Sequence, residues 1–205
     1  MKNLFKRFIK GLGKPKPAAS TISDPRDRSI AISSRKSASE FKNDGDVYLQ
    51  SGDLEKAEQS YRDAIAVDAR HAKALSNLGF VLKEKGRYVE AESFLQRATA
   101  IDSHSADTYY VLGMTLHALN NFDAAATSYA RAFEVDPHFE IAYHDLSILL
   151  IENGKNDTAK EIIQRAINLF PESVVFHFLL GNIYYGEQQL DLAVRSFEAA
   201  LSIRP

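Results

Sequence analysis

A repeat of 34 residues is the feature that most constrains how this chain can fold. Counted from Ala38, alanine recurs at the same two places in each of five successive repeats. The twentieth residue is Ala57, Ala91, Ala125, Ala159 and Ala193, and the twenty-seventh is Ala64, Ala98, Ala132, Ala166 and Ala200. A fixed period of about 20 to 50 residues is typical of architectures in which each unit buries its apolar face against the next. The period therefore predicts a stacked array.

Helical spacing appears twice within every repeat. Large apolar side chains recur at positions 4, 7 and 11, and again at positions 24 and 28, so that each group lies on one face of a helix. Glycine at position 8 and the two alanines let neighbouring backbones approach closely. Between the two stretches stand residues that tolerate positive φ, namely Gly52, Gly86, Asn120 and Gly154. Each repeat is predicted to be a pair of helices joined by a tight turn.

These residues resemble the tetratricopeptide repeat family, whose 34-residue unit is a pair of antiparallel helices. The resemblance covers residues 38–205, in repeats 38–71, 72–105, 106–139, 140–173 and 174–205. It implies an all-α fold, a right-handed α-solenoid of antiparallel helix pairs, in which the first helix of each pair lines a concave groove. Residues 1–37 remain outside the array as a basic arm and linker.

Three repeats depart from the pattern. The first has Asp44 in place of leucine, and we expect its polar first helix to face water. The fourth has Ser147 for glycine and Asn156 for a large apolar residue, so we expect it to pack least well. The fifth ends at Pro205 without a further polar helix, which predicts a self-associating surface formed by Phe197, Leu201 and Ile203.

The family places six positions of the first helix in the groove, and here the floor is polar at one end and apolar or aromatic in its centre. The positions include Asp46 and Asp145, and the predicted peptide-binding residues are Lys42, Asn77, Phe80, Tyr110, Met114, His117, His144, Ile148, Phe178, Asn182 and Tyr185. Apolar and aromatic side chains of this kind suit an amphipathic helix or an extended peptide. The alternative is that Phe80, Met114 and Ile148 are buried between helices and form no site.

Some family members hold the carboxylate ends of chaperones with a set of five lysine, arginine and asparagine residues. The corresponding residues here are Lys42, Asp46, Asn77, Asp107 and Val111, which agree at two of the five positions. Two acids would repel a carboxylate. We therefore predict no chaperone ligand of this type.

The arm differs in charge from the array. Residues 1–37 contain ten Lys and Arg and two acids, so that the net charge is +8, whereas residues 38–205 have a net charge of −10. Residues 2–14 combine lysines at steps of four with apolar side chains in a 140° arc if the segment is helical. The residues expected to contact a membrane or a partner are Leu4, Phe5, Lys6, Phe8, Ile9, Lys10 and Leu12.

Two hypotheses for the arm stay open. It could dock on an anionic membrane surface and leave the array free, or it could occupy the groove of this or another copy of the chain. A disordered tail is the alternative without a function, and the rest of the arm has the composition of a flexible linker. Lysine and arginine interrupt the apolar run that a signal peptide needs, and an organelle transit peptide is disfavoured because arginine is scarce. The acidic array argues against nucleic-acid binding.

No pattern indicates catalysis or a bound cofactor. The chain has no cysteine, which fits a reducing cytoplasm and excludes thiolate chemistry. Its six histidines have no metal-ligand spacing, and phosphate-binding, nucleophile-elbow and dinucleotide motifs are missing. We predict no metal, no cofactor and no enzymatic activity.

The sequence thus favours a cytoplasmic adaptor or scaffold that binds another protein and is held at a membrane surface if the arm docks there. One alternative is a self-assembling protein. Another is the substrate-presenting part of a glycosyltransferase system, whose catalytic domain this chain has no room for.

Overall fold

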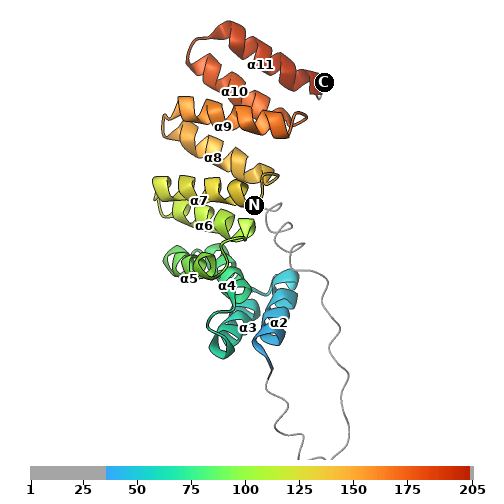
Figure 1. Cartoon of the computed structure of the whole chain (residues 1–205), viewed down its shortest axis with the longest axis vertical. Helices are drawn as coiled ribbons and strands as arrows, with labels where there is room; N and C mark the ends of the chain where they lie inside the picture. The colour runs from blue at the N-terminus through green and yellow to red at the C-terminus, as the bar shows by residue number, and fades with distance from the viewer. Residues whose placement is uncertain (1–35, 204–205) are drawn as a thin grey trace, which may run out of the picture. The chain divides into compact units, whose positions relative to one another are not determined.

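The computed structural model describes residues 36–203, and all the regular structure in this range is α-helical (Figure 1). The helices are α2 (Ala38–Ser51), α3 (Leu54–Val67), α4 (Ala72–Glu84), α5 (Tyr88–Ile101), α6 (Ala106–Ala118), α7 (Phe122–Val135), α8 (Glu140–Glu152), α9 (Asn156–Leu169), α10 (Val174–Gly186) and α11 (Leu190–Ile203). None of these helices has the length and apolar character needed to cross a membrane.

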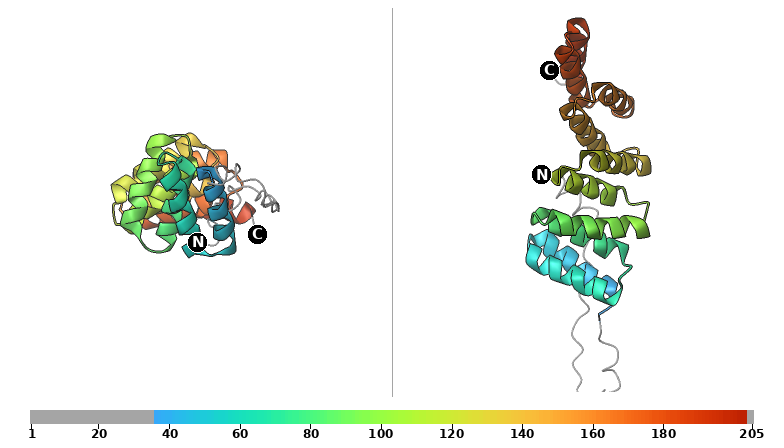
Figure 2. Two further views of the ribbon diagram at one scale, coloured as in Figure 1. Left: turned by 90° about the horizontal axis from the view of Figure 1, so that it is seen from below. Right: turned by 90° about the vertical axis from the view of Figure 1, so that its left-hand side faces the viewer.

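Consecutive helices pack as antiparallel pairs, which Figure 2 shows from two further directions. The pairs are α2–α3, α4–α5, α6–α7, α8–α9 and α10–α11. In every pair the first helix begins at the residue where the sequence predicts a repeat to start. The prediction of an all-α solenoid of antiparallel helix pairs is confirmed. The chain divides after Ser103 into two compact units, one containing α2–α5 and the other α6–α11.

Short-range hydrogen bonds fix where several helices begin. The Ser37 hydroxyl accepts a hydrogen bond from the backbone N–H of Glu40, and the Glu40 carboxylate accepts one from the backbone N–H of Ser37 at 2.7 Å. This capping box satisfies donors that the first turn of α2 leaves unpaired. Ser105 caps α6 in the simpler way, by accepting a hydrogen bond from the N–H of Thr108.

The turns between paired helices have the predicted left-handed residue. Gly52, Gly86 and Gly154 have φ of 81°, 73° and 70°, and Asn120 has φ of 58°. In the fifth repeat, where the sequence pattern indicates no such residue, Gln188 adopts φ of 60°. The geometry of the turn is therefore kept although the favoured residue types are not.

Glycine at position 8 allows close helix packing within each unit. A Cβ added to Gly45 would lie 2.5 Å from the ring of Tyr61, and one added to Gly113 would lie 2.6 Å from the ring of Tyr129. The alanines at positions 20 and 27 are buried in all five repeats. The side chain at position 24 thus lies directly against the backbone of the first helix, as the pattern of small residues predicts.

The fourth pair is the exception. Ser147 is fully buried and its hydroxyl donates to the carbonyl oxygen of Tyr143 at 2.7 Å, within the same helix. Helices α8 and α9 pack less closely than the other four pairs. The serine side chain stands where, in the other pairs, the side chain at position 24 packs against a glycine, which agrees with the expectation that this repeat packs least well.

Candidate functional site

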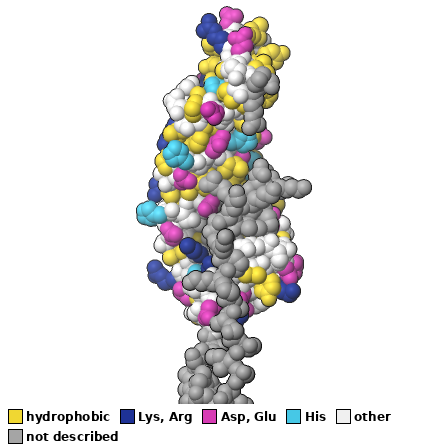
Figure 3. All heavy atoms as spheres, turned by 90° about the vertical axis from the view of Figure 1, so that its right-hand side faces the viewer, with side chains coloured by type: hydrophobic (Ala, Val, Ile, Leu, Met, Phe, Trp, Pro, Cys, Tyr) yellow, Lys and Arg dark blue, Asp and Glu magenta, His cyan; other side chains and the backbone are white. Residues whose placement is uncertain are grey.

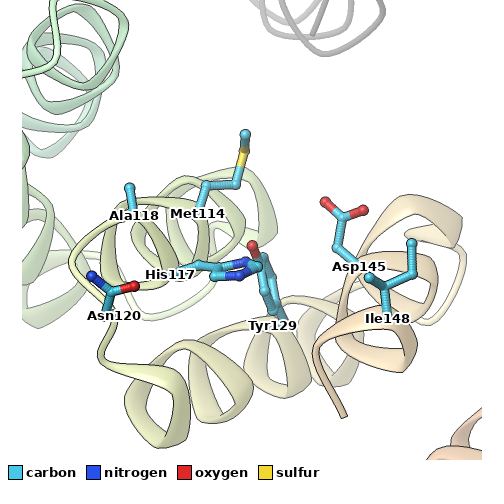
Figure 4. Close-up of a pocket in the computed structure, with 7 residues that line it drawn as sticks. All are labelled: Met114, His117, Ala118, Asn120, Tyr129, Asp145 and Ile148. Carbon is cyan, nitrogen blue, oxygen red and sulfur yellow. The ribbon is translucent and has the colours of Figure 1, made fainter. Parts of the chain in front are cut away.

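A pocket of about 510 Å³ opens on the second unit between α6, α7 and α8 (Figure 4). Its lining residues are Met114, His117, Ala118, Asn120, Tyr129, Asp145 and Ile148. The structure therefore brings together Met114, His117 and Ile148, which the sequence predicts as groove residues. A pocket of this size has room for one or two side chains of a peptide.

Regular helix geometry places the lining on two walls. Met114, His117 and Ala118 follow at steps of three and four on the last turns of α6, and Asp145 and Ile148 are three residues apart on α8. Tyr129 of α7 can reach between them because Gly113 has no side chain in its path. Burial and, to a lesser extent, the nearby Asp145 carboxylate raise the pKa of Tyr129 above its ordinary value.

Asp145 is held in place by its neighbours. One oxygen accepts a hydrogen bond from the Tyr110 hydroxyl at 2.5 Å, and the other lies 2.8 Å from Nδ1 of His144. The Asp145 side chain is 27% exposed. Because a carboxylate can accept about four hydrogen bonds, these two contacts leave capacity for a ligand donor.

Aromatic rings support this arrangement. The Tyr110 ring is buried, with its centroid 5.6 Å from that of Tyr129 and 5.2 Å from that of Phe139. The His117 ring meets the edge of Phe122 at 5.8 Å. The Tyr110 hydroxyl therefore contributes to the site through Asp145, while its ring belongs to the core.

The charges of the second unit are divided between its helices. The first helices of the pairs, α6, α8 and α10, contain four acids and no Lys or Arg; the acids are Asp107, Glu140, Asp145 and Glu152. The Lys and Arg residues of this unit lie on the second helices, in a turn or at the C-terminus. Of the helices that line the pocket, α6 and α8 therefore present acidic and apolar side chains, whereas α7 also carries Arg131.

In the first unit, the predicted groove residues are more enclosed. Phe80 is fully buried, and the Lys83 amine lies 5.2 Å from the centroid of its ring. Asn77 is buried and donates to Asp46 at 3.0 Å, and Lys42 donates to the other oxygen of the same carboxylate at 2.8 Å. The Tyr61 hydroxyl completes the cluster with a hydrogen bond of 2.9 Å to Asp46.

This cluster explains further why a carboxylate ligand is not expected. Lys42 and Asn77, the two residues that agree with the chaperone-binding pattern, both contact the carboxylate of Asp46. Asp46 is buried although the sequence predicts a polar first helix that faces water. That expectation is wrong at this residue because Tyr61 and Asn77 come from later helices and cover it.

The remaining predicted groove residues lie on α8 and α10. His144 is half-buried beside Asp145, whereas Phe178, Asn182 and Tyr185 are exposed. Of the residues predicted for self-association, Leu201 is exposed and Phe197 and Ile203 are half-buried. Figure 3 shows hydrophobic side chains at the surface of this end of the second unit. The Phe178 and Phe197 rings lie 5.8 Å apart, so that the apolar surfaces of α10 and α11 are continuous.

The sequence also predicts that the arm contacts a membrane or a partner, and that the chain holds no metal. The arm residues Leu4, Phe5, Lys6, Phe8, Ile9, Lys10 and Leu12 lie outside the described residues. Within residues 36–203, no group of three His, Asp or Glu side chains is placed to hold a metal ion.

The sequence pattern does not indicate every lining residue. Tyr129 has the spacing of a core residue and Asn120 that of a turn residue, and both assignments are correct, but both side chains also line the pocket. Asp145 is among the positions that the family places in the groove. Its hydrogen bond to Tyr110, which lies 35 residues earlier, carries no signal in the sequence.

Four family models match the chain. They are described as tetratricopeptide repeats and match residues 45–86, 70–137, 116–183 and 175–205. Together they extend over residues 45–205. A comparison with curated protein sequences finds no match.

Solved structures with the same fold include MamA, at 26% sequence identity and a TM-score of 0.72, covering 78% of this chain and 93% of that one. MamA from Desulfovibrio magneticus RS-1 matches at 19% identity and a TM-score of 0.71, with 81% and 94% covered. YrrB, described as a TPR protein with an unusual peptide-binding site, matches at 22% identity and a TM-score of 0.72, with 87% and 91% covered. Likenesses below 25% identity are evidence of the fold alone.

Proposed function

Because the chain belongs to the tetratricopeptide repeat family, we propose that it is a non-enzymatic scaffold that binds a peptide or helix of another protein. The binding surface is the face of α6 and α8 in the second unit. Members of this family present extended surfaces to protein partners rather than deep clefts to small molecules.

The pocket of α6–α8 is the observation that carries the proposal. It joins two apolar walls, Met114 and Ile148, to an oriented carboxylate, Asp145. An apolar side chain of a peptide can enter between the walls while a neighbouring donor or cation meets the carboxylate. Such a combination of an apolar anchor with a polar contact is how peptide grooves obtain both affinity and specificity.

Selection from a phage-displayed library of random peptides on the full chain tests the proposal. A selected peptide is then titrated by fluorescence anisotropy against the full chain and its variants. We expect Met114→Ala or Ile148→Ala to weaken binding about fivefold or more, as truncation of an interface anchor does. The matched control is Val194→Ala, an exposed apolar residue on α11, which should leave the Kd unchanged. Equal losses for all three variants would place the peptide elsewhere and contradict the proposal.

Membrane tethering by residues 2–14 is an alternative function of the arm and rests on the sequence of the arm. Sedimentation of the full chain with vesicles containing anionic lipid at low salt tests it. We expect the combined substitution Lys6→Glu and Lys10→Glu to abolish pelleting, because short basic segments bind such surfaces largely through their charge. Pelleting that is the same with and without these charges would disprove tethering by the arm.

Self-assembly is a second candidate function, supported by the surface of α10 and α11. Helix α10 contains no Lys, Arg, Asp or Glu and exposes Phe178 and Tyr185, and α11 exposes Leu201. Exposed apolar surface without charge is typical of protein contacts. We propose a second copy of this chain as the partner of the α10–α11 surface. The mass of the protein in solution tests this self-association.

A further inference from the structure

The charge of the second unit restricts the ligands that its pocket can accept. Residues 104–205 contain six Lys and Arg against thirteen Asp and Glu. Among the residues that line the pocket, Asp145 is the acid and none is Lys or Arg, and α6 and α8 as whole helices also carry acids and no Lys or Arg. An acidic peptide would therefore be repelled, and a basic one attracted, before any contact is made.

One segment of this chain has the complementary chemistry. Residues 2–14 contain five cations and no acid, and they include the large apolar side chains of Phe5 and Phe8. A pocket with apolar walls and a carboxylate requires an apolar side chain next to a cation. In this segment Phe5 is followed by Lys6, and Phe8 is preceded by Arg7 and followed two residues later by Lys10.

We propose that residues 2–14 are a ligand of the α6–α8 pocket of their own chain, with a phenylalanine between Met114 and Ile148 and a cation at Asp145. This inference rests on the proposed function, since it names an occupant for the same site. The arm and a peptide of another protein would then compete for the same pocket.

Because residues 2–14 are covalently linked to the array, a low affinity is sufficient for this segment to occupy the pocket. Residues 15–37 connect the segment to α2, and their composition predicts a flexible linker. A flexible tether gives an effective concentration of about 1 mM for its bound end. A segment with a Kd of about 100 μM would therefore occupy the pocket most of the time, although a free peptide of the same sequence would bind weakly.

The chain contains no cysteine and no tryptophan. A single introduced cysteine can therefore carry a fluorophore, and a single introduced tryptophan can act as its quencher. A bimane fluorophore is attached to Ala118→Cys, an exposed position on the pocket rim, and the quencher is introduced as Phe8→Trp in the full chain. Tryptophan quenches bimane only at close contact. The matched control carries the fluorophore at Gln164→Cys, an exposed position on α9.

We expect Phe8→Trp to lower the fluorescence of the label at position 118 by about half or more, as an occupied pocket requires, and to leave the label at position 164 unchanged. The quenching should be independent of protein concentration, and a synthetic peptide of residues 1–16 should reverse it only when its concentration exceeds the effective concentration of about 1 mM of the tethered segment. Asp145→Asn should reduce it, whereas the exposed control Asp191→Asn on α11 should not.

Three results would overturn the proposal. Absence of quenching at position 118, or equal quenching at both positions, would show that the segment does not bind the pocket. Quenching that rises with protein concentration would place the segment in another copy of the chain. Absence of quenching together with arm-dependent pelleting on anionic vesicles would make a membrane its ligand. The proposed function is judged separately, since selected peptides that depend on Met114 and Ile148 would support it in each of these cases.

Discussion

At the level of single residues, Glu58 is a buried charge of the first unit that is surrounded by cations. This side chain of α3 is only 6% exposed, and it receives hydrogen bonds from Lys85, Arg87 and Arg62. Burial by itself would raise the pKa of Glu58, but the three cations outweigh it and lower the pKa to about 2. Because two of these cations follow α4, Glu58 connects the first repeat to the second.

The stabilisation by Glu58 depends on pH in a definite direction. A lowered pKa in the folded state means that the contribution is present above the ordinary pKa of 4.5 and is lost as the pH falls from 4.5 toward 2. The difference corresponds to at most about 3 kcal/mol, and to less in practice because Arg62 and Arg87 are more than a third exposed and screened by water.

Urea unfolding at neutral pH and at low pH measures this contribution. Glu58→Gln should lower the free energy of unfolding at neutral pH, and the deficit should shrink as the pH falls below 4.5. The control is Glu55→Gln on the same helix, whose side chain is 78% exposed and should contribute little. A deficit that is equal at both pH values would contradict the assigned charge contacts.

Two buried tyrosines provide a second test at this scale. The Tyr61 hydroxyl donates to the buried Asp46, whereas the buried Tyr143 hydroxyl has no hydrogen-bond partner among the described residues. Tyr61→Phe should therefore destabilise the protein by about 1 to 3 kcal/mol, because it removes a donor from a buried carboxylate. Tyr143→Phe should be neutral or stabilising, since it removes an unpaired polar group. Thermal unfolding of the two variants distinguishes these outcomes, and a larger loss for Tyr143→Phe would refute the hydrogen-bond assignment.

At the scale of helices, the small residues decide how closely each pair packs. Gly113 lies against the ring of Tyr129, whereas the corresponding residue of the fourth pair, Ser147, already has a side chain and its helices lie further apart. The same position in the repeat is therefore under different steric constraint in neighbouring pairs.

Substitution by alanine should separate the two cases. Gly113→Ala gains helix propensity, but its Cβ must displace the Tyr129 ring, so we expect a net loss of about 1 to 3 kcal/mol. Ser147→Ala loses only a hydrogen bond to its own helix and should change stability by less than about 1 kcal/mol. The free energies of unfolding of the two variants are the measurement. If Gly113→Ala proved as stable as the parent, the close approach of α6 and α7 would be wrong.

At the scale of the whole molecule, the apolar surface of α10 and α11 predicts self-association. Leu201 is 64% exposed and belongs to the same continuous surface as Phe178 and Phe197. Light scattering across a range of protein concentrations should show a mass above that of one chain, and Leu201→Glu should reduce it because a buried charge opposes the contact. The control is Val67→Glu, at an isolated exposed apolar residue of α3.

Removal of residues 1–37 adds an independent result. An assembly that persists without the arm and is lost with Leu201→Glu would locate the contact on α10 and α11. If the assembly is lost when the arm is removed, the contact between copies depends on the arm instead. A single-chain mass for the full chain at every concentration would refute self-association.

Spacing in the sequence was sufficient to predict the helix pairs, the start of each repeat, the turns of the first four repeats and the small buried residues. These features depend on spacing within one repeat, since steps of three and four residues define a helix face, and Gly, Asn, Ser and Asp act on the few residues around them. For this reason the repeat starts at Ala72 and Ala106 and the turn at Asn120 agree with the structure.

Only the tertiary structure decided which distant side chains meet. The burial of Asp46 by Tyr61 and Asn77, the contact of Tyr110 with Asp145 and the joint lining of a pocket by Met114 and Ile148 all join residues of different helices. These contacts depend on how closely two helices approach and on which rotamer fits between them. A repeat pattern specifies the face on which a residue lies, whereas packing against the neighbouring helix determines whether that residue is buried, paired or available to a ligand.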